Sequence, residues 1–100
     1  MTKGTMQKIE LRVVNKVYKL YFIDGKYDSL EVHTQFGNQI HKEKYQRWEN
    51  EQIVREVIYM IGKQDSISFK EIYRMFEKND PKFYEITSKI LEKIKSEYNF

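Results

Sequence analysis

The stretch KIELRVVNKVYKLYFI, Lys8 to Ile23, decides the fold, because apolar residues recur at every second position on both sides of a central Asn-Lys pair. This alternation is typical of two strands that each bury one face. A two-residue turn at Asn15-Lys16 would join the strands as a hairpin. One face would then pair Val13 with Tyr18, Leu11 with Leu20 and Ile9 with Phe22, and the other would carry Arg12 beside Lys19 and Glu10 beside Tyr21.

The same alternation continues in LEVHTQF, where Leu30, Val32 and Phe36 fall on one side. For Leu30 to share a face with Leu20, the loop between them must hold an odd number of residues, for example residues 24–28. A two-residue turn at Asp24-Gly25 reaches the same face only if a bulge follows it. Both solutions predict a third antiparallel strand.

A third turn of three residues, 37–39, would lead into a fourth strand over about 40–45. This segment is polar and contains two lysines, which suits the edge of a sheet because charged side chains discourage further strand pairing.

The spacing of apolar residues changes near Trp48 from every second position to every third or fourth, which indicates helices. A first helix is predicted over about 50–61, with Gly62 placed to end it. Its apolar stripe is Val54, Val57, Ile58 and Ile61.

Two further helices have clear start signals. Ser68 and Glu71 have the spacing of a capping box, and Ile67 and Ile72 that of a hydrophobic staple, so a second helix should run from Ser68 to about Lys78. Asp80 and Pro81 would begin a third helix that reaches about Glu97. The predicted buried residues are Phe69, Ile72, Tyr73 and Phe76 in the second helix and Phe83, Ile86, Ile90, Leu91 and Ile94 in the third.

These elements predict an α+β fold in which an N-terminal antiparallel sheet of three to four strands is followed by three C-terminal helices packed on it. With 100 residues, 40% of them hydrophobic, the chain has the length of one domain. We therefore expect a single domain over 1–100, with a β-sheet half at 1–47 and a three-helix half at 48–100.

Composition excludes several classes of function. The absence of cysteine excludes disulfides, thiolate metal sites and cysteine nucleophiles. No apolar run is long enough to span a membrane, and the first ten residues lack the apolar core of a secretory signal, so a cytoplasmic protein without membrane contact is expected. The lack of Ala and the abundance of Lys, Ile, Tyr, Phe and Asn indicate AT-rich codons, as in many viruses and mobile elements, which would place the protein in a host cytoplasm.

The two histidines are the one candidate for catalysis or metal binding. If the third turn has three residues, Glu31, His33, His41 and Glu43 share one face of the sheet. If it has two, the histidines point to opposite faces. No nucleophile or glycine-rich phosphate loop accompanies them, so we expect no enzyme activity, no cofactor and no metal.

The three-helix half resembles a generic helix-turn-helix unit, since only residues 78–80 separate the second and third predicted helices. That resemblance implies a last helix in the major groove of DNA. Charge argues against it, because residues 1–47 hold nine Lys or Arg and five Asp or Glu, whereas residues 48–100 hold nine and ten. Candidate DNA contacts are Lys82, Lys89 and Lys93 on the last helix and Arg12 and Lys19 on a basic strand face that also carries Tyr21.

Fifteen aromatic residues exceed the needs of a small core. Tyr and Trp are favoured as interface anchors because they combine apolar area with a hydrogen-bonding group on a stiff side chain. Those predicted to be partly exposed are Tyr18, Tyr27, Tyr45, Trp48, Tyr59 and Tyr84, and all except Tyr27 are candidates for binding a partner.

The sequence thus favours a small, non-enzymatic binding protein that acts through protein–protein contacts and associates with itself, most simply as a homodimer. A DNA-binding transcriptional regulator that uses the C-terminal helices is the alternative.

Overall fold

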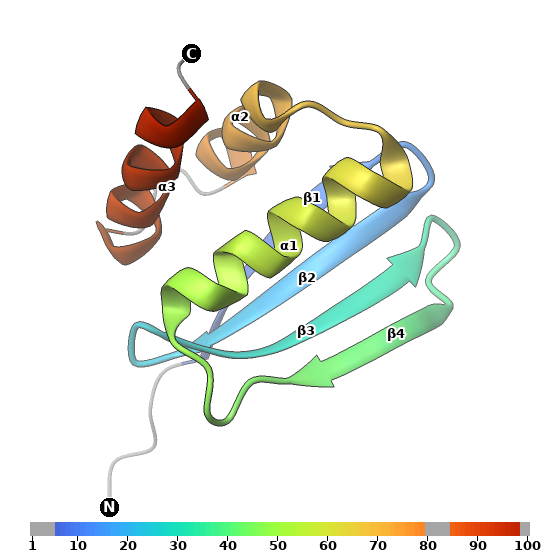
Figure 1. Cartoon of the computed structure of the whole chain (residues 1–100). Coiled ribbons are helices and arrows are strands. Elements are labelled where there is room, and N and C mark those ends of the chain that lie inside the picture. The colour runs from blue at the N-terminus through green and yellow to red at the C-terminus, as the bar shows by residue number, and fades with distance from the viewer. Residues whose placement is uncertain (1–5, 80–84, 99–100) are drawn as a thin grey trace, which may run out of the picture. The chain divides into compact units, whose positions relative to one another are not determined.

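The protein contains a four-stranded antiparallel sheet followed by three helices, as the sequence predicts (Figure 1). The structure is a computed structural model that describes residues 6–79 and 85–98. It divides into two compact units, Met1–Arg47 and Trp48–Phe100, at the predicted boundary. Within the described residues, none of the helices has the length and apolar character needed to cross a membrane.

The sheet has the order β1-β2-β3-β4, so each strand neighbours the next one in the chain. Its strands are β1 (Met6–Val13), β2 (Lys16–Ile23), β3 (Lys26–Thr34) and β4 (Gln39–Lys44). One face, which we call the apolar face, carries buried side chains: Ile9, Leu11, Val13, Tyr18, Leu20, Phe22, Tyr27, Leu30 and Val32. The opposite, polar face carries most of the charged residues of the strands.

The first hairpin forms, but its predicted register is wrong. The turn lies at Val14-Asn15, so that Leu11 pairs with Tyr18 and Ile9 with Leu20. Because this register differs from the predicted one by two positions in the partner strand, every side chain keeps its predicted face.

Charge explains the choice of register. The predicted pairing set Arg12 beside Lys19, and like charges directly opposite one another destabilise a sheet. The observed pairing places Glu10 opposite Lys19 instead. The observed pairing requires a left-handed conformation at Val14, with φ of 49°. This conformation is unfavourable for a β-branched residue.

The second turn is the two-residue alternative with a bulge, and the five-residue loop over 24–28 is wrong. Asp24 and Gly25 both have positive φ, 52° and 79°, which is the geometry that an Asp-Gly hairpin turn requires. The bulge lies between β2 and β3, where Tyr21 pairs with Ser29 and Phe22 with Tyr27. The bulge returns Leu30 to the apolar face opposite Leu20.

The predicted three-residue third turn is also wrong, because four residues, 35–38, connect β3 to β4. Thr34 closes this loop: its amide donates to the Asn38 carbonyl at 2.8 Å and its hydroxyl accepts from the Asn38 amide at 3.1 Å. Gly37 has φ of 89°, a conformation open to glycine. β4 then forms one edge of the sheet, as predicted.

Helix α1 (Asn50–Asp65) runs four residues past its predicted end. Gly62 does not stop it, because Lys63 and Gln64 are good helix formers and the helix ends instead at Ser66, which adopts a left-handed conformation with φ of 55°. The predicted stripe of Val54, Val57, Ile58 and Ile61 is buried.

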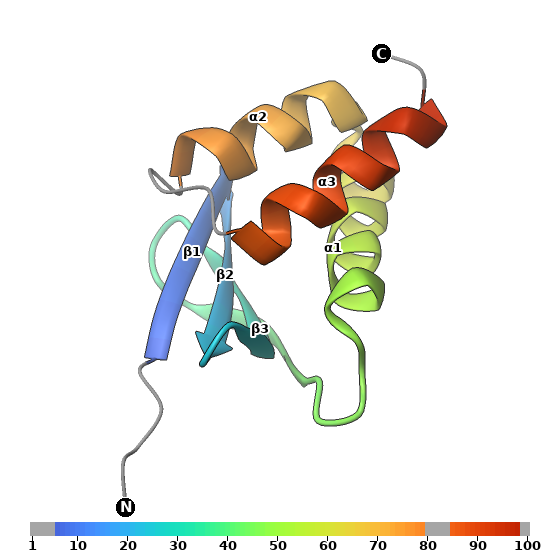
Figure 2. The same cartoon turned by 90° about the vertical axis from the view of Figure 1, so that its left-hand side faces the viewer.

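Helix α2 (Phe69–Asn79) begins at the predicted cap, where the Ser68 hydroxyl accepts a hydrogen bond from the Glu71 amide at 3.3 Å. Helix α3 (Glu85–Tyr98) reaches the predicted end within one residue. α1 contacts both α2 and α3 (Figure 2).

The predicted buried stripes of α2 and α3 are largely confirmed. Phe69, Ile72, Phe76, Leu91 and Ile94 are buried, whereas Tyr73 and Ile90 are half-buried. The predicted turn at 78–80 is wrong in its first two residues, because α2 continues through Asn79. The Asp80 and Pro81 start signals lie outside the described residues, as do the side chains of Phe83 and Ile86.

Candidate binding surfaces

The predicted partner-binding aromatic residues divide into buried and exposed groups. Tyr18 and Tyr45 are fully buried and Tyr27 nearly so, which makes the prediction that they are partly exposed wrong. Tyr18 lies on the apolar face opposite Leu11, and the rings of Phe22 and Tyr27 are in contact, with 3.9 Å between centroids. These side chains therefore belong to the core.

Tyr59 and Trp48 remain candidates for binding a partner. Tyr59 is 58% exposed, and its hydroxyl accepts a hydrogen bond from Lys63 Nζ at 3.0 Å. Trp48 is half-buried. Tyr84 lies outside the described residues.

Lys93, one of the predicted DNA-binding lysines of α3, lies where a neighbouring carboxylate offsets its charge. Lys93 Nζ binds Glu51 Oε1 of α1 at 2.7 Å, and the Arg55 guanidinium binds Glu97 Oε2 of α3 at 2.5 Å. Both ion pairs thus join α3 to α1. Lys89 is exposed, and Lys82 lies outside the described residues.

This network of ion pairs shifts the pKa values of its members. The hydrogen bond from Lys93 lowers the pKa of Glu51, the hydrogen bond from Arg55 lowers that of Glu97, and Glu97 raises that of Arg55. The network therefore ties α1 to α3 with groups that remain ionised at neutral pH.

We expect acid to weaken the protein through such carboxylates. A depressed pKa means that the folded state favours the ionised form, so the stabilisation is complete above the ordinary value of 4.5 and is lost as the pH falls through the lower, folded value. The free energy of unfolding, measured with guanidinium chloride, should fall as the pH is lowered from about 5 to about 3. In Glu97→Gln this decline should be shallower, and a wild-type free energy that stays constant to pH 3 would contradict the pairing.

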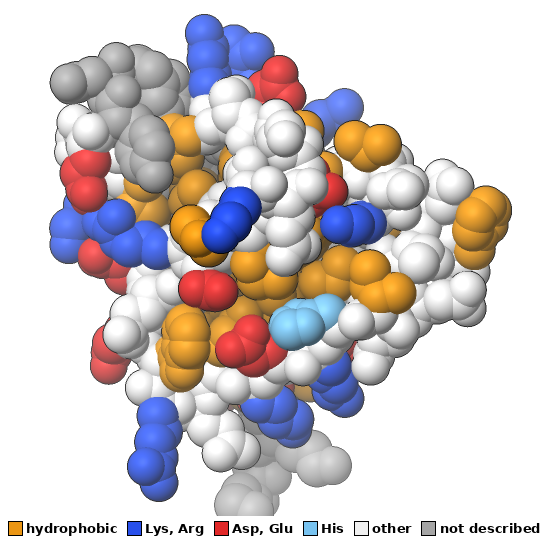
Figure 3. All heavy atoms as spheres, turned by 45° about the vertical axis from the view of Figure 1, so that its right-hand side comes forward, with side chains coloured by type: hydrophobic (Ala, Val, Ile, Leu, Met, Phe, Trp, Pro, Cys, Tyr) orange, Lys and Arg blue, Asp and Glu red, His pale blue; other side chains and the backbone are white. Residues whose placement is uncertain are grey.

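The polar face of the sheet holds the predicted basic residues Arg12 and Lys19. Directly opposite or neighbouring positions bring five cationic residues and two carboxylates to this face: Lys8, Arg12, Lys19, Lys42, Lys44, Glu10 and Glu31. The carboxylates lie among the cations, since Glu10 binds Lys8 at 2.9 Å and Arg12 at 3.5 Å. Figure 3 views the molecule from another side, where hydrophobic side chains (orange) form the centre and Lys or Arg (blue) and Asp or Glu (red) side chains are scattered around them.

Tyr21, the aromatic residue of the predicted basic strand face, forms a hydrogen bond within the polar face. Its hydroxyl donates to Glu31 Oε1 at 3.3 Å, and burial together with this carboxylate raises the pKa of Tyr21. Glu31 also contacts His33 Nε2 at 2.9 Å, and this hydrogen bond lowers the pKa of Glu31. Such a mixed cluster lacks the continuous positive charge that nucleic-acid backbones select.

The histidine cluster does not form. His33 pairs with Gln39 and His41 with Val32, so the two histidines lie on opposite faces of the sheet. The cause is the earlier turn together with a bulge at Ile40, which place His41 opposite Val32 instead of the predicted Gln35, an odd shift of three positions that reverses its face. In the described part of the chain, no three His, Asp or Glu side chains are placed to hold a metal ion.

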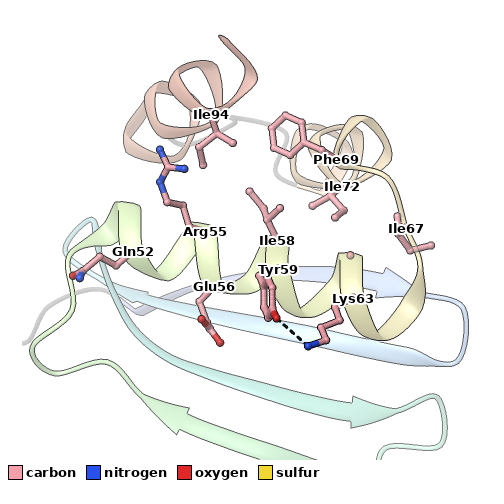
Figure 4. A pocket seen from close by; sticks show the side chains of 11 residues that line it. Gln52, Arg55, Glu56, Ile58, Tyr59, Lys63, Ile67, Phe69, Ile72 and Ile94 are labelled. Atoms are coloured by element: carbon pink, nitrogen blue, oxygen red, sulfur yellow. Dashed lines mark hydrogen bonds between the residues drawn. The ribbon is translucent and has the colours of Figure 1, made fainter. Parts of the chain in front are cut away.

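A groove of about 710 Å³ lies among α1, α2 and α3. Figure 4 shows Ile58, Phe69, Ile72 and Ile94 directed toward it, with Tyr59 and Lys63 along α1. The side chains directed into it are already buried, with Ile58 and Phe69 only 7% and 8% exposed, whereas Tyr59 is exposed and Ile67 half-buried. Apart from these two residues, the groove offers little apolar surface for a partner to cover.

The most exposed large apolar side chains of the described chain lie elsewhere, at Val14 (87%) and Phe36 (82%). They stand on the β1–β2 turn and the β3–β4 loop, which meet at one end of the sheet (Figure 1). The Gln35 amide donates to the Asn15 carbonyl at 2.9 Å, which ties the two segments together. We call residues 14–15 and 35–38 the turn patch.

Sequence reasoning missed the turn patch. It placed Phe36 on the apolar side of a strand, whereas Phe36 lies in the loop and points to solvent. The available signal was Gly37, which marks a left-handed position one residue after Phe36. Val14 could not be found from sequence, because a β-branched residue is a poor candidate for a turn with positive φ.

Comparisons of the chain with protein-family models, with curated proteins and with solved structures found no match. The binding surfaces must therefore be judged from their own geometry.

Proposed function

We propose that this protein is a non-enzymatic binding module that recognises another polypeptide through the turn patch. The observation that supports the proposal is the joint exposure of Val14 and Phe36 on two hydrogen-bonded loops. Single exposed apolar residues are common on protein surfaces, whereas two of them on segments joined by a hydrogen bond favour an interaction site.

The composition of the turn patch favours a polypeptide partner. Residues 14–15 and 35–38 are Val-Asn and Gln-Phe-Gly-Asn, which include no charged side chain. Nucleic acids and anionic lipids select cations, whereas amide side chains around an aromatic anchor match the polar rim and apolar centre of protein interfaces. The partner should therefore present an apolar pocket bordered by hydrogen-bonding groups.

The backbone of Val14 adds a second reason. A β-branched residue in the left-handed region costs about 1–2 kcal/mol, and strain of this kind concentrates at functional sites. An Asn at this position would relieve the strain because it adopts positive φ readily. Its absence is consistent with a requirement for an apolar side chain here.

The proposal can be tested with 12-residue peptides selected from a random library on the immobilised wild-type chain. The dissociation constants of the selected peptides should rise at least about tenfold for Phe36→Ser, since truncation of an interface anchor costs about 1–2 kcal/mol or more. For Val14→Asn, binding should also weaken while the free energy of unfolding rises by about 1 kcal/mol. Loss of binding in a more stable variant cannot result from unfolding.

Two results would overturn the proposal. One is a set of selected peptides that bind both variants as tightly as the wild type. The other is binding of a random 30-base-pair DNA duplex that weakens between about 50 and 200 mM salt, which would assign the protein to the DNA-binding alternative.

A further inference from the structure

β1 is the less protected edge of the sheet. β4, the opposite edge, has six residues, a bulge at Ile40 and the exposed lysines 42 and 44, all features that discourage strand pairing. β1 has eight residues with regular pairing to β2 and contains neither a bulge nor a proline. Among the described strands, β2 is its one neighbour.

The register of the first hairpin fixes which backbone groups β1 presents outward. In a two-residue turn, the flanking residues Val13 and Lys16 form a hydrogen-bonded pair. Hydrogen-bonded and non-hydrogen-bonded pairs alternate along an antiparallel ladder, so Ile9 and Leu11 also bond toward β2. The amides and carbonyls of Lys8, Glu10 and Arg12 then point away from the sheet.

A second copy of β1 could pair with this edge in an antiparallel direction. The residues whose backbone groups point outward, Lys8, Glu10 and Arg12, would then lie opposite one another. Glu10 would then face Lys8, Glu10 or Arg12 of that copy. The register with Glu10 opposite Glu10 places two carboxylates together and Lys8 opposite Arg12. Like charges directly opposite one another destabilise the pairing.

The remaining two registers differ in their apolar pairs. With Glu10 opposite Lys8, Leu11 faces the polar Gln7 of the other copy. With Glu10 opposite Arg12, Leu11 faces Leu11 and Ile9 faces Val13. The second register thus forms two opposite-charge pairs on the polar face and matches apolar residues on the apolar face.

We propose that two copies of this chain associate through their β1 strands, antiparallel and centred on Leu11, so that the sheet continues from one copy into the other. The exposure of Arg12, whose side chain is 73% accessible, leaves it available to a second carboxylate in addition to Glu10 of its own strand. The charge order Lys-Glu-Arg at alternate positions makes the edge complementary to itself.

Charge reversal tests both the association and its register. Sedimentation equilibrium should show a wild-type dimer, and Glu10→Arg or Arg12→Glu alone should raise its dissociation constant about tenfold or more, because two attractions become two repulsions. The double variant Glu10→Arg/Arg12→Glu should return the constant to within about threefold of the wild type, since it restores both pairs with the charges exchanged. Circular dichroism at low protein concentration verifies that each variant is folded.

Three results would overturn the proposal: a wild-type monomer at all concentrations, a dimer that both single reversals leave unchanged, or single reversals that the double variant fails to correct. Recovery in Lys8→Glu/Glu10→Lys would assign the register with Glu10 opposite Lys8. Phe36→Ser should leave the dissociation constant of the dimer unchanged, so failure of this inference is separable from failure of the partner site.

Amide hydrogen exchange provides a second measurement of the same edge. As protein concentration rises, exchange at Glu10 and Arg12 should slow, because their amides become hydrogen-bonded to the second copy. The amides of Ile9 and Leu11 should be protected at every concentration. Equal, concentration-independent exchange at Glu10 and Arg12 in a sample that contains dimer would show that the copies meet elsewhere.

Discussion

Tyr18→Ala is expected to lower the free energy of unfolding by about 3–5 kcal/mol, as for other large aromatic side chains removed from a core. Tyr18 is fully buried on the apolar face of β2, where it lies opposite Leu11 on one side and Val32 on the other. Removal of its ring would leave a cavity between three strands. Equilibrium unfolding in urea, followed by circular dichroism, measures the loss.

Tyr59→Ala is the matched control, because Tyr59 is another aromatic residue with a predicted binding role but is mostly exposed. Its unfolding free energy should stay within about 0.5–1 kcal/mol of the wild type. Similar losses in the two variants would contradict the assignment of Tyr18 to the core and Tyr59 to the surface.

Phe76→Ala should have a comparable effect in the helical unit. Phe76 is fully buried on α2, one turn beyond Ile72 on the same stripe, and loss of a buried phenyl ring costs about 3–5 kcal/mol. The midpoint of urea unfolding should therefore shift markedly toward lower denaturant concentration. Glu77→Ala, next to it on the exposed side of α2, provides the control and should shift the midpoint little.

An unchanged midpoint in Phe76→Ala would mean that the α2 stripe is not packed as described. A shift in Glu77→Ala as large as that in Phe76→Ala would have the same meaning, because it would remove the distinction between the two sides of the helix.

The face on which each strand residue lies could be predicted from sequence, but the residue opposite it in the neighbouring strand could not. A shift of two positions between paired strands leaves every side chain on the same face, so Leu11 and Leu20 share a face in both the predicted and the observed register. The apolar face was therefore predicted correctly although the position of the turn was not. The position of the turn depends on a small balance between the Arg12–Lys19 repulsion and the left-handed backbone at Val14. The spacing of apolar residues does not show which of these two effects is larger.

The bulges had a larger consequence for the candidate sites. A bulge near Asp28 restored Leu30 to its predicted face, whereas the bulge at Ile40 moved His41 to the face opposite His33 and removed the predicted cluster. A single extra residue reverses the side of every residue after it. A site assembled from two strands is therefore less predictable than the core face of either strand.

The helices were predicted more fully because their signals are local. The Ser68 cap fixed the start of α2, and the apolar stripes identified Ile58, Ile72 and Ile94 as buried. The binding role of the aromatic residues was harder to predict, since Tyr18, Tyr45 and Tyr59 have the same chemistry in sequence and differ only in burial.

Both the proposed partner site and the proposed dimer depend on the register of the first hairpin. This register exposes Val14 and directs the backbone of Glu10 and Arg12 outward. Contacts between α-protons in the nuclear Overhauser spectrum test it most directly, since these protons approach closely only in non-hydrogen-bonded antiparallel pairs. The turn at Val14-Asn15 predicts strong contacts from Arg12 to Val17 and from Glu10 to Lys19. Strong contacts from Val13 to Tyr18 and from Leu11 to Leu20 would contradict this register. They would rule out both the turn patch and the β1 dimer.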